Sequence, residues 1–224
     1  EHPLSEGFRL EEMRQIRQDY DAYLLYVDSE FNRLYQSLSA QGVLDDTLLV
    51  LTSDHGEMFE RGIVRHGKAT LHEPVIRIPL MLFHPGFDQR IDVYQRTTAM
   101  DVYPTLSALA GLPHPESSTG KVMPPFGMQA SNPDEAFIIT HAEGTQRFQP
   151  LTFGSWTIFK GDLKLSRYSG YPMMPEGETL HEMYDIKADP EELVDLASSE
   201  AGRAGELINE LVETVENSNR PYRS

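Results

Sequence analysis

Two adjacent residues with the chemistry of metal ligands follow an apolar run. Asp54 and His55 follow residues 47–52 after a single serine, Ser53, and Gly56 comes next. A carboxylate oxygen and a neutral imidazole nitrogen both bind divalent cations. The glycine lets the backbone turn sharply, so that the two side chains can converge on one ion. The alternative interpretation is a polar turn that only closes a strand.

A short basic segment, Arg65-His66-Gly67-Lys68, has the chemistry of an anion site. A lysine ammonium is a compact point charge that suits an anionic oxygen, and His66 could bind the same anion. The alternatives are a surface lysine on a loop and a histidine that caps the loop. Glu57 could act as a base or support a metal ligand, and a solvated loop acid is the simpler interpretation.

The elements that must position these residues alternate between helix and buried strand. Apolar residues at steps of three and four predict a long helix over 10–38. The continuous apolar runs 47–52 and 80–83 predict strands buried on both faces, as in a parallel sheet covered by helices. Shorter helices are expected near 71–76 and over 101–110. The pattern predicts an α/β layered sheet, in which ligands gather beyond the carboxyl ends of parallel strands.

Two residues near the short helix receive a purely structural interpretation. Glu73 and Arg77 lie four residues apart, a spacing that predicts an ordinary ion pair on one helix face. His72 shows no ligand spacing with the other histidines, so no role is assigned to it.

The last third of the chain predicts an antiparallel arrangement, with strand candidates at residues 136–140, 156–159, 163–168 and 180–186. Asp189-Pro190-Glu191-Glu192 has the pattern of a capping box, so a helix is expected to begin there. A last helix is expected over 203–216. We therefore predict two domains: an α/β core over 1–130, and a small subdomain of antiparallel sheet and helix over 131–224.

Composition argues against several classes of function. The chain has 224 residues, a formal net charge of −16 and no cysteine. A surface this acidic repels a phosphate backbone, so nucleic-acid binding is not expected. The lack of cysteine removes disulfides and zinc–thiolate sites. No apolar run is long enough to span a membrane, so we expect a soluble protein, with periplasmic, secreted and cytoplasmic locations in a bacterium all open.

Several short segments occur in an informative order. They are Tyr20-Asp21-Ala22, Tyr26-Val27-Asp28, Leu44-Asp45-Asp46-Thr47, residues 49–57, His66-Gly67-Lys68, residues 76–81, 101–106 and 110–113, and, near the end, residues 183–186, 189–192 and 196–197. The ordered set resembles the second half of the sulfatase family, within the alkaline-phosphatase-like superfamily. The resemblance implies the C-terminal part of an αβα sandwich with a mainly parallel sheet.

The resemblance also implies roles for particular residues. Asp54 and His55 match a pair of metal ligands, and Lys68 matches a lysine that contacts the bound sulfate ester. Calcium is the family's usual ion. An imidazole ligand also suits manganese or another transition ion, so manganese is an alternative, and magnesium is a further one. Lys68 is thus the expected catalytic residue, with His66 beside it as a substrate contact.

One part of the family's machinery is missing from this sequence. Family members carry a Cys or Ser in a C/S-x-P-x-R motif, which is converted to formylglycine, the nucleophile. The chain has no Cys, and it has no Ser-x-Pro-x-Arg. We therefore expect a C-terminal portion that is inactive alone, with the N-terminal half of the same enzyme as its partner and a sulfate ester as the substrate.

Two other functions are compatible with these residues. A phosphonate monoester or phosphodiester hydrolase of the same superfamily also carries the Asp-His-Gly-Glu version of the metal loop. A non-catalytic binding module that kept only the scaffold is the second alternative. In either case half a sheet would expose an apolar edge, which predicts self-association.

Overall fold

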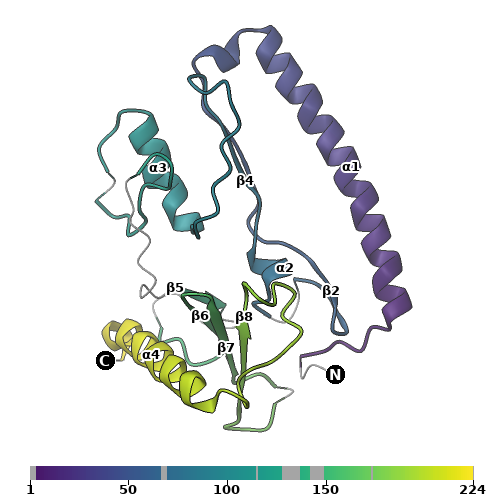
Figure 1. Cartoon of the computed structure of the whole chain (residues 1–224), viewed down its shortest axis with the longest axis vertical. Coiled ribbons are helices and arrows are strands. Elements are labelled where there is room, and N and C mark those ends of the chain that lie inside the picture. The colour runs from purple at the N-terminus through teal and green to yellow at the C-terminus, as the bar shows by residue number, and fades with distance from the viewer. Residues whose placement is uncertain are drawn as a thin grey trace. The chain divides into compact units, whose positions relative to one another are not determined.

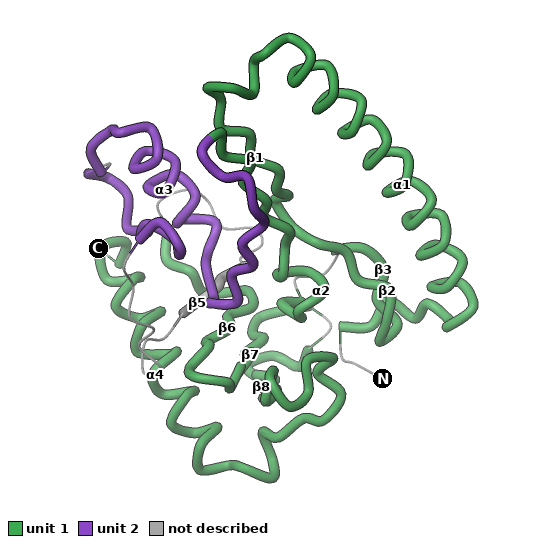
Figure 2. The backbone as a smooth tube through the Cα atoms, turned by 45° about the horizontal axis from the view of Figure 1, so that its top comes forward, with its two compact units in different colours: residues 1–85, 135–224 green, residues 86–134 purple. Residues whose placement is uncertain are grey.

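The computed structural model describes residues 4–66, 70–114, 116–127, 137–141, 149–172 and 174–223. These residues form two compact units, one made of residues 1–85 and 135–224 and the other of residues 86–134 (Figure 2). The mixture of helices and small sheets confirms the α/β class (Figure 1). The predicted domain boundary at residue 130 falls outside the described ranges and stays a prediction. Within those ranges every helix is too short or too polar to cross a bilayer.

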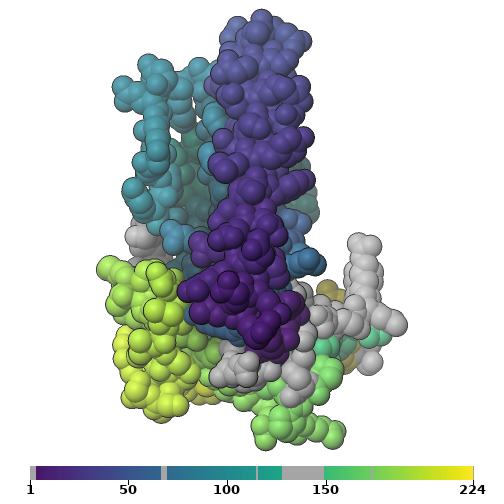
Figure 3. All heavy atoms as spheres, turned by 90° about the vertical axis from the view of Figure 1, so that its right-hand side faces the viewer, coloured from purple at the N-terminus to yellow at the C-terminus, as the bar shows by residue number. Residues whose placement is uncertain are grey.

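The first element is the predicted long helix, α1, which spans Leu10–Ala40. It begins at a capping box between Arg9 and Glu12, and Gly42 follows it in a left-handed conformation. Of the helix's residues, all of them described, only Met13 is buried. Figure 3 shows one face of α1 open along its length. The exposed large apolar side chains on it are Leu10, Tyr23, Leu24, Leu25, Tyr26, Val27 and Leu34.

The two apolar runs form strands β1, Leu49–Thr52, and β4, Leu80–Phe83, which pair with each other antiparallel. The sequence predicted mainly parallel pairing, and for the described strands that prediction is wrong. A parallel pair needs a crossover connection that carries the chain back to the same end of the sheet, usually through a helix packed on its face. The connection from β1 to β4 contains a tight hairpin and a four-residue helix, and it simply reverses the chain.

The connection between these strands holds structure that the sequence analysis missed. Strands β2, Met58–Glu60, and β3, Ile63–Arg65, form a hairpin. Its turn residues Arg61 and Gly62 have φ values of 54° and 74°, the left-handed pair that a tight hairpin turn requires. Met58 and Ile63 are buried and pack against Val75 of helix α2, which spans Glu73–Ile76.

The smaller unit contains helix α3, Val102–Leu109, after a 3₁₀ turn over Ala99–Asp101. The Asp101 carboxylate accepts hydrogen bonds from the backbone N–H groups of Thr98 and Lys121, each at 2.8 Å. The Thr105 hydroxyl donates to the Asp101 carbonyl at 2.6 Å and accepts from the N–H of Met123 at 2.9 Å. These bonds confirm the predicted helix and tie the following loop to it.

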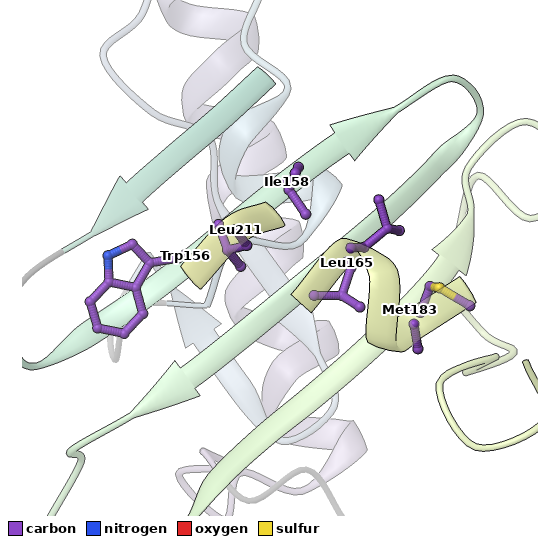
Figure 4. Close-up of a cluster of buried hydrophobic side chains, with 7 residues drawn as sticks. Trp156, Ile158, Leu165, Met183 and Leu211 are labelled. Atoms are coloured by element: carbon purple, nitrogen blue, oxygen red, sulfur yellow. The ribbon is translucent and has the colours of Figure 1, made fainter. Parts of the chain in front are cut away.

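The C-terminal sheet confirms the predicted antiparallel strand pairing. Its strands pair in the order β5 (Phe137–His141), β6 (Gly154–Lys160), β7 (Leu163–Ser169) and β8 (Thr179–Asp185). Helix α4, Ala201–Asn219, packs against it through a core that includes Trp156, Ile158, Leu165, Met183 and Leu211 (Figure 4). A 3₁₀ turn over Arg220–Tyr222 follows α4.

The helix predicted to begin at Asp189 does not form. Residues 189–200, all described, follow turns and bends until α4 begins at Ala201. Glu192 has a φ of 55°, a left-handed conformation that cannot continue a right-handed helix. Its side chain points into the protein, where it is fully buried against the Lys164 ammonium. Tertiary contacts thus override the local capping pattern.

Candidate functional site

The loop after β1 brings Asp54 and His55 together. The backbone N–H of His55 donates to Asp54 Oδ1 at 3.1 Å, and His55 Nε2 lies 3.7 Å from Asp54 Oδ2. The Asp54 side chain is 89% exposed and that of His55 is 37% exposed. An oxygen and a nitrogen ligand at this separation, both open to solvent, are compatible with binding one cation.

The hydrogen bond of the His55 ring determines which nitrogen is available as a ligand. Nδ1 lies 3.0 Å from the carbonyl oxygen of Gly56. A carbonyl can only accept, so Nδ1 carries the proton and Nε2 of the neutral ring keeps its lone pair. Nε2 is also the atom that faces Asp54. A backbone carbonyl that orients a histidine in this way is common behind metal-binding imidazoles.

Gly56 is needed for a different reason from the one the sequence suggested. Its backbone is not among the left-handed ones. Instead its N–H donates to the carbonyl of Val75 at 2.7 Å, and a Cβ at this position would lie 2.1 Å from the carbonyl oxygen of Pro74. The loop that carries Asp54 and His55 is therefore pressed directly against helix α2.

His66 and Glu57 place further potential metal-ligand atoms beside His55. His66 Nδ1 lies 3.0 Å from Glu57 Oε1, and the rings of His55 and His66 have centroids 3.9 Å apart. One ligand atom from each of the three residues lies within 4.8 Å of the others. The Glu57 side chain is only 18% exposed, so it is not the solvated loop acid that the sequence favoured. The β2–β3 hairpin, unrecognised in the sequence, places it there.

Lys68, the residue expected to contact the anion, lies outside the described residues.

A groove lies beside Glu57 and is lined by residues of α1, the β2 region and α2. Its lining residues are Arg17, Tyr20, Asp21, Glu57, Phe59, Glu60 and Pro74. The rings of Tyr20 and Phe59 meet there with centroids 5.2 Å apart.

An ionic cluster at the N-terminal end of α2 is formed by His72, Glu73, Lys164 and Glu192. Lys164 Nζ is 2.6 Å from Glu192 Oε1 and 3.3 Å from Glu73 Oε1. His72 Nδ1 lies 3.2 Å from Glu192 Oε2. Glu73, which the sequence paired with Arg77, is thus used in tertiary contacts. The histidine that received no role is 1% exposed and belongs to this cluster.

The electrostatics of this cluster favour an ionised Glu192. Burial by itself raises the pKa of its carboxyl. The hydrogen bond from His72 and the positive charge of Lys164 act in the opposite direction and outweigh burial, so the pKa falls to about 2. The glutamate is therefore a fixed negative charge within the protein.

Comparison with known protein families identifies the relatives of this chain. Residues 3–112 match the sulfatase family model. The chain is 31% identical over 198 residues to a choline-sulfatase of Rhizobium meliloti (strain 1021), covering 86% of this chain and 35% of the relative. It is 27% identical over 198 residues to arylsulfatase K of Rattus norvegicus, covering 85% of this chain and 33% of the relative. The chain spans about a third of the length of these relatives.

Solved structures share the fold. One, solved with its substrate D-glucosamine-2-N,6-O-disulfate, matches with a TM-score of 0.66 and 26% identity over 95% of this chain and 42% of its own. The phosphonate monoester hydrolase of Agrobacterium radiobacter matches with a TM-score of 0.69 and 23% identity over 93% of this chain and 42% of its own.

Proposed function

Because the chain belongs to the sulfatase family, we propose that it supplies the metal-binding loop of an enzyme that hydrolyses sulfate esters. The observation that carries this proposal is the pair formed by Asp54 and His55. An exposed carboxylate and an imidazole nitrogen that keeps its lone pair face each other at 3.7 Å, directly after β1.

The residues present fit a divalent cation in their donor chemistry. Asp54 would supply a hard oxygen and His55 a neutral nitrogen, and Glu57 and His66 lie close enough to His55 to support or extend that set. When bound, the ion would supply Lewis-acid polarisation of the oxygens of the sulfate group. Calcium is proposed first, as the ion usual in the family. Manganese is an alternative because an imidazole ligand also suits a transition ion, and magnesium is a further alternative for the carboxylate oxygens.

The basic segment after β3 is proposed to bind the substrate's anionic group. Lys68 is assigned the catalytic role of stabilising negative charge on the ester, and His66 is assigned a contact to the same group. Glu57 accepts a hydrogen bond from His66 in the structure, which would hold the imidazole in place for that contact.

The nucleophile is proposed to come from outside this sequence. The chain contains no cysteine, and it covers only about a third of the sulfatases it matches. We assign the formylglycine and the remaining metal ligands to the rest of the parent enzyme. A lone Asp–His pair offers too few ligands for a tight hard-cation site, so the 224-residue chain alone is expected to be inactive.

The test is turnover of an aryl sulfate by the parent enzyme that contains this chain. Asp54→Ala should lower kcat/KM at least a thousandfold, because the metal and its charge stabilisation are lost together. Asp88→Ala, which removes an exposed carboxylate in the smaller unit, is the matched control and should retain activity. Equal activity of the two variants would overturn the assignment of Asp54.

Phosphoryl transfer is the second candidate function. A phosphonate monoester hydrolase shares the fold. Hydrolases of that kind were also expected to carry the Asp-His-Gly-Glu version of the loop, which this chain has at residues 54–57. The same parent enzyme assayed on an aryl phosphonate monoester separates the two functions. A kcat/KM higher for the phosphonate than for the sulfate would favour this second candidate.

A further inference from the structure

We propose that Glu192 is a positioning residue for the metal-binding loop. It holds the N-terminus of α2, and α2 in turn fixes the backbone that carries Asp54 and His55. Any effect of Glu192 on catalysis rests on the proposed function. The claim that Glu192 fixes the position of α2 and of the loop after β1 rests only on the contacts described below.

The first step is the contact between Glu192 and α2. Glu192 Oε2 accepts the backbone N–H of Glu73 at 2.8 Å and lies 3.2 Å from His72 Nδ1. The first N–H groups of a helix have no partner within the helix and need one from elsewhere. His72, at the N-cap position, does not cap α2 with its own side chain. The cap comes instead from a carboxylate 119 residues further along the chain.

The second step is the way in which Glu192 itself is held. Its other carboxylate oxygen lies 2.6 Å from Lys164 Nζ in β7, and neither side chain is exposed. The guanidinium of Arg61 donates to the carbonyl oxygens of Glu191 and Glu192, each at 2.7 Å. The left-handed backbone of Glu192 is unfavourable for a residue with a Cβ, and these contacts hold it in place.

The third step runs from α2 to the metal-binding loop. The carbonyl of Val75, in α2, accepts the N–H of Gly56 at 2.7 Å, and Gly56 approaches Pro74 too closely for any side chain. The carbonyl of Gly56 in turn accepts from Nδ1 of His55. A displacement of α2 therefore moves the group that orients the His55 ring.

A single substitution of Glu192 would mix two effects, because it leaves the Lys164 charge buried without its partner. Two double variants separate them. Glu192→Gln/Lys164→Met removes both charges but keeps an amide oxygen that can accept from Glu73 and His72. Glu192→Leu/Lys164→Met removes the same charges and has a side chain of similar volume, but that side chain offers no hydrogen-bond acceptor. A difference in amide exchange between the two double variants therefore reports the loss of the helix cap alone.

The measurement is amide hydrogen exchange at Gly56 in the isotopically labelled 224-residue chain. Exchange at Gly56 should be at least tenfold faster in the Leu variant than in the Gln variant. Exchange at Leu165 and Ile158, buried residues of the C-terminal sheet, should be equal in both. Equal exchange at Gly56 would overturn the proposal.

A folding failure is separated from a positioning effect in the same experiment. If the Leu variant does not fold, Glu192→Asn/Lys164→Met replaces it, because the shorter side chain withdraws the acceptor but stays polar. Exchange at Gly56 as slow as in the Gln variant would then count against the proposal. Amide exchange needs no catalysis, so a parent enzyme that fails to hydrolyse sulfate esters would overturn the proposed function and leave this result standing.

Discussion

The Lys164 ammonium lies 2.6 Å from a carboxylate oxygen of Glu192, and neither side chain is exposed to solvent. This pair joins β7 of the C-terminal sheet to the turn that follows β8, and Glu192 extends the connection to α2. A buried charge pair is costly to form and costlier to break, because the remaining charge has no water around it. The pair therefore makes the antiparallel sheet part of the support of the loop that carries Asp54 and His55.

The first prediction concerns the stability of this pair. Lys164→Met leaves the Glu192 carboxylate buried beside an apolar side chain, so the free energy of unfolding should fall by about 3–5 kcal/mol. Lys160→Met, in the neighbouring strand β6, breaks a partly exposed pair with Glu210 of α4 and should cost about 1 kcal/mol or less. Urea unfolding followed by circular dichroism measures both. Similar losses for the two variants would contradict a buried pair.

The second prediction concerns acid. The folded pKa of Glu192, about 2, lies below its ordinary value of 4.5, so the folded chain binds fewer protons than the unfolded chain between these values. The contribution is present in full above pH 4.5 and is lost as the pH falls toward 2. A shift of this size corresponds to about 3 kcal/mol. The unfolding free energy should fall more steeply between pH 4.5 and 2 in the natural chain than in Glu192→Gln/Lys164→Met. The same dependence on pH in both proteins would contradict the lowered pKa of Glu192.

The third prediction concerns the close approach of Gly56 to α2. Gly56→Ala places a methyl group 2.1 Å from the carbonyl oxygen of Pro74, so the loop and helix must separate. Metal affinity of the parent enzyme should drop at least tenfold. Gly205→Ala, in α4 with open space around it, is the matched control and should leave affinity unchanged. Calorimetric titration measures both, and unaltered affinity in Gly56→Ala would show that the loop tolerates the displacement.

The fourth prediction concerns the exposed apolar face of α1. Tyr23 and Tyr26, three residues apart and therefore on the same side of the helix, are 64% and 59% exposed. A contiguous apolar face that is open to water favours burial against another molecule. The 224-residue chain should self-associate as its concentration rises, and Tyr23→Ser/Tyr26→Ser should reduce the association. Sedimentation velocity distinguishes the outcomes. A monomer at every concentration would contradict this expectation.

The sequence predicts the long local elements well, because their signals are local. The apolar periodicity of α1 and the Gly161-Asp162 turn between β6 and β7 place those elements nearly where the structure has them. The adjacency of Asp54 and His55 after a strand also follows from the sequence, since neighbours in the chain stay neighbours in space.

What the sequence could not predict depends on tertiary contacts. The antiparallel pairing of β1 with β4 is decided by the connection between them, in which the β2–β3 hairpin went unrecognised. Glu192 carries a convincing helix-start pattern but caps α2 instead, because the buried Lys164 draws its side chain inward. The sequence around Lys164, in the middle of β7, does not show that its ammonium will pair with a carboxylate from a turn 28 residues later.

Metal titration of the parent enzyme tests whether Asp54 and His55 hold a divalent cation. We expect one tightly bound calcium or manganese ion in the Asp88→Ala control and no measurable binding in Asp54→Ala. Equal stoichiometry and affinity in the two variants would contradict it.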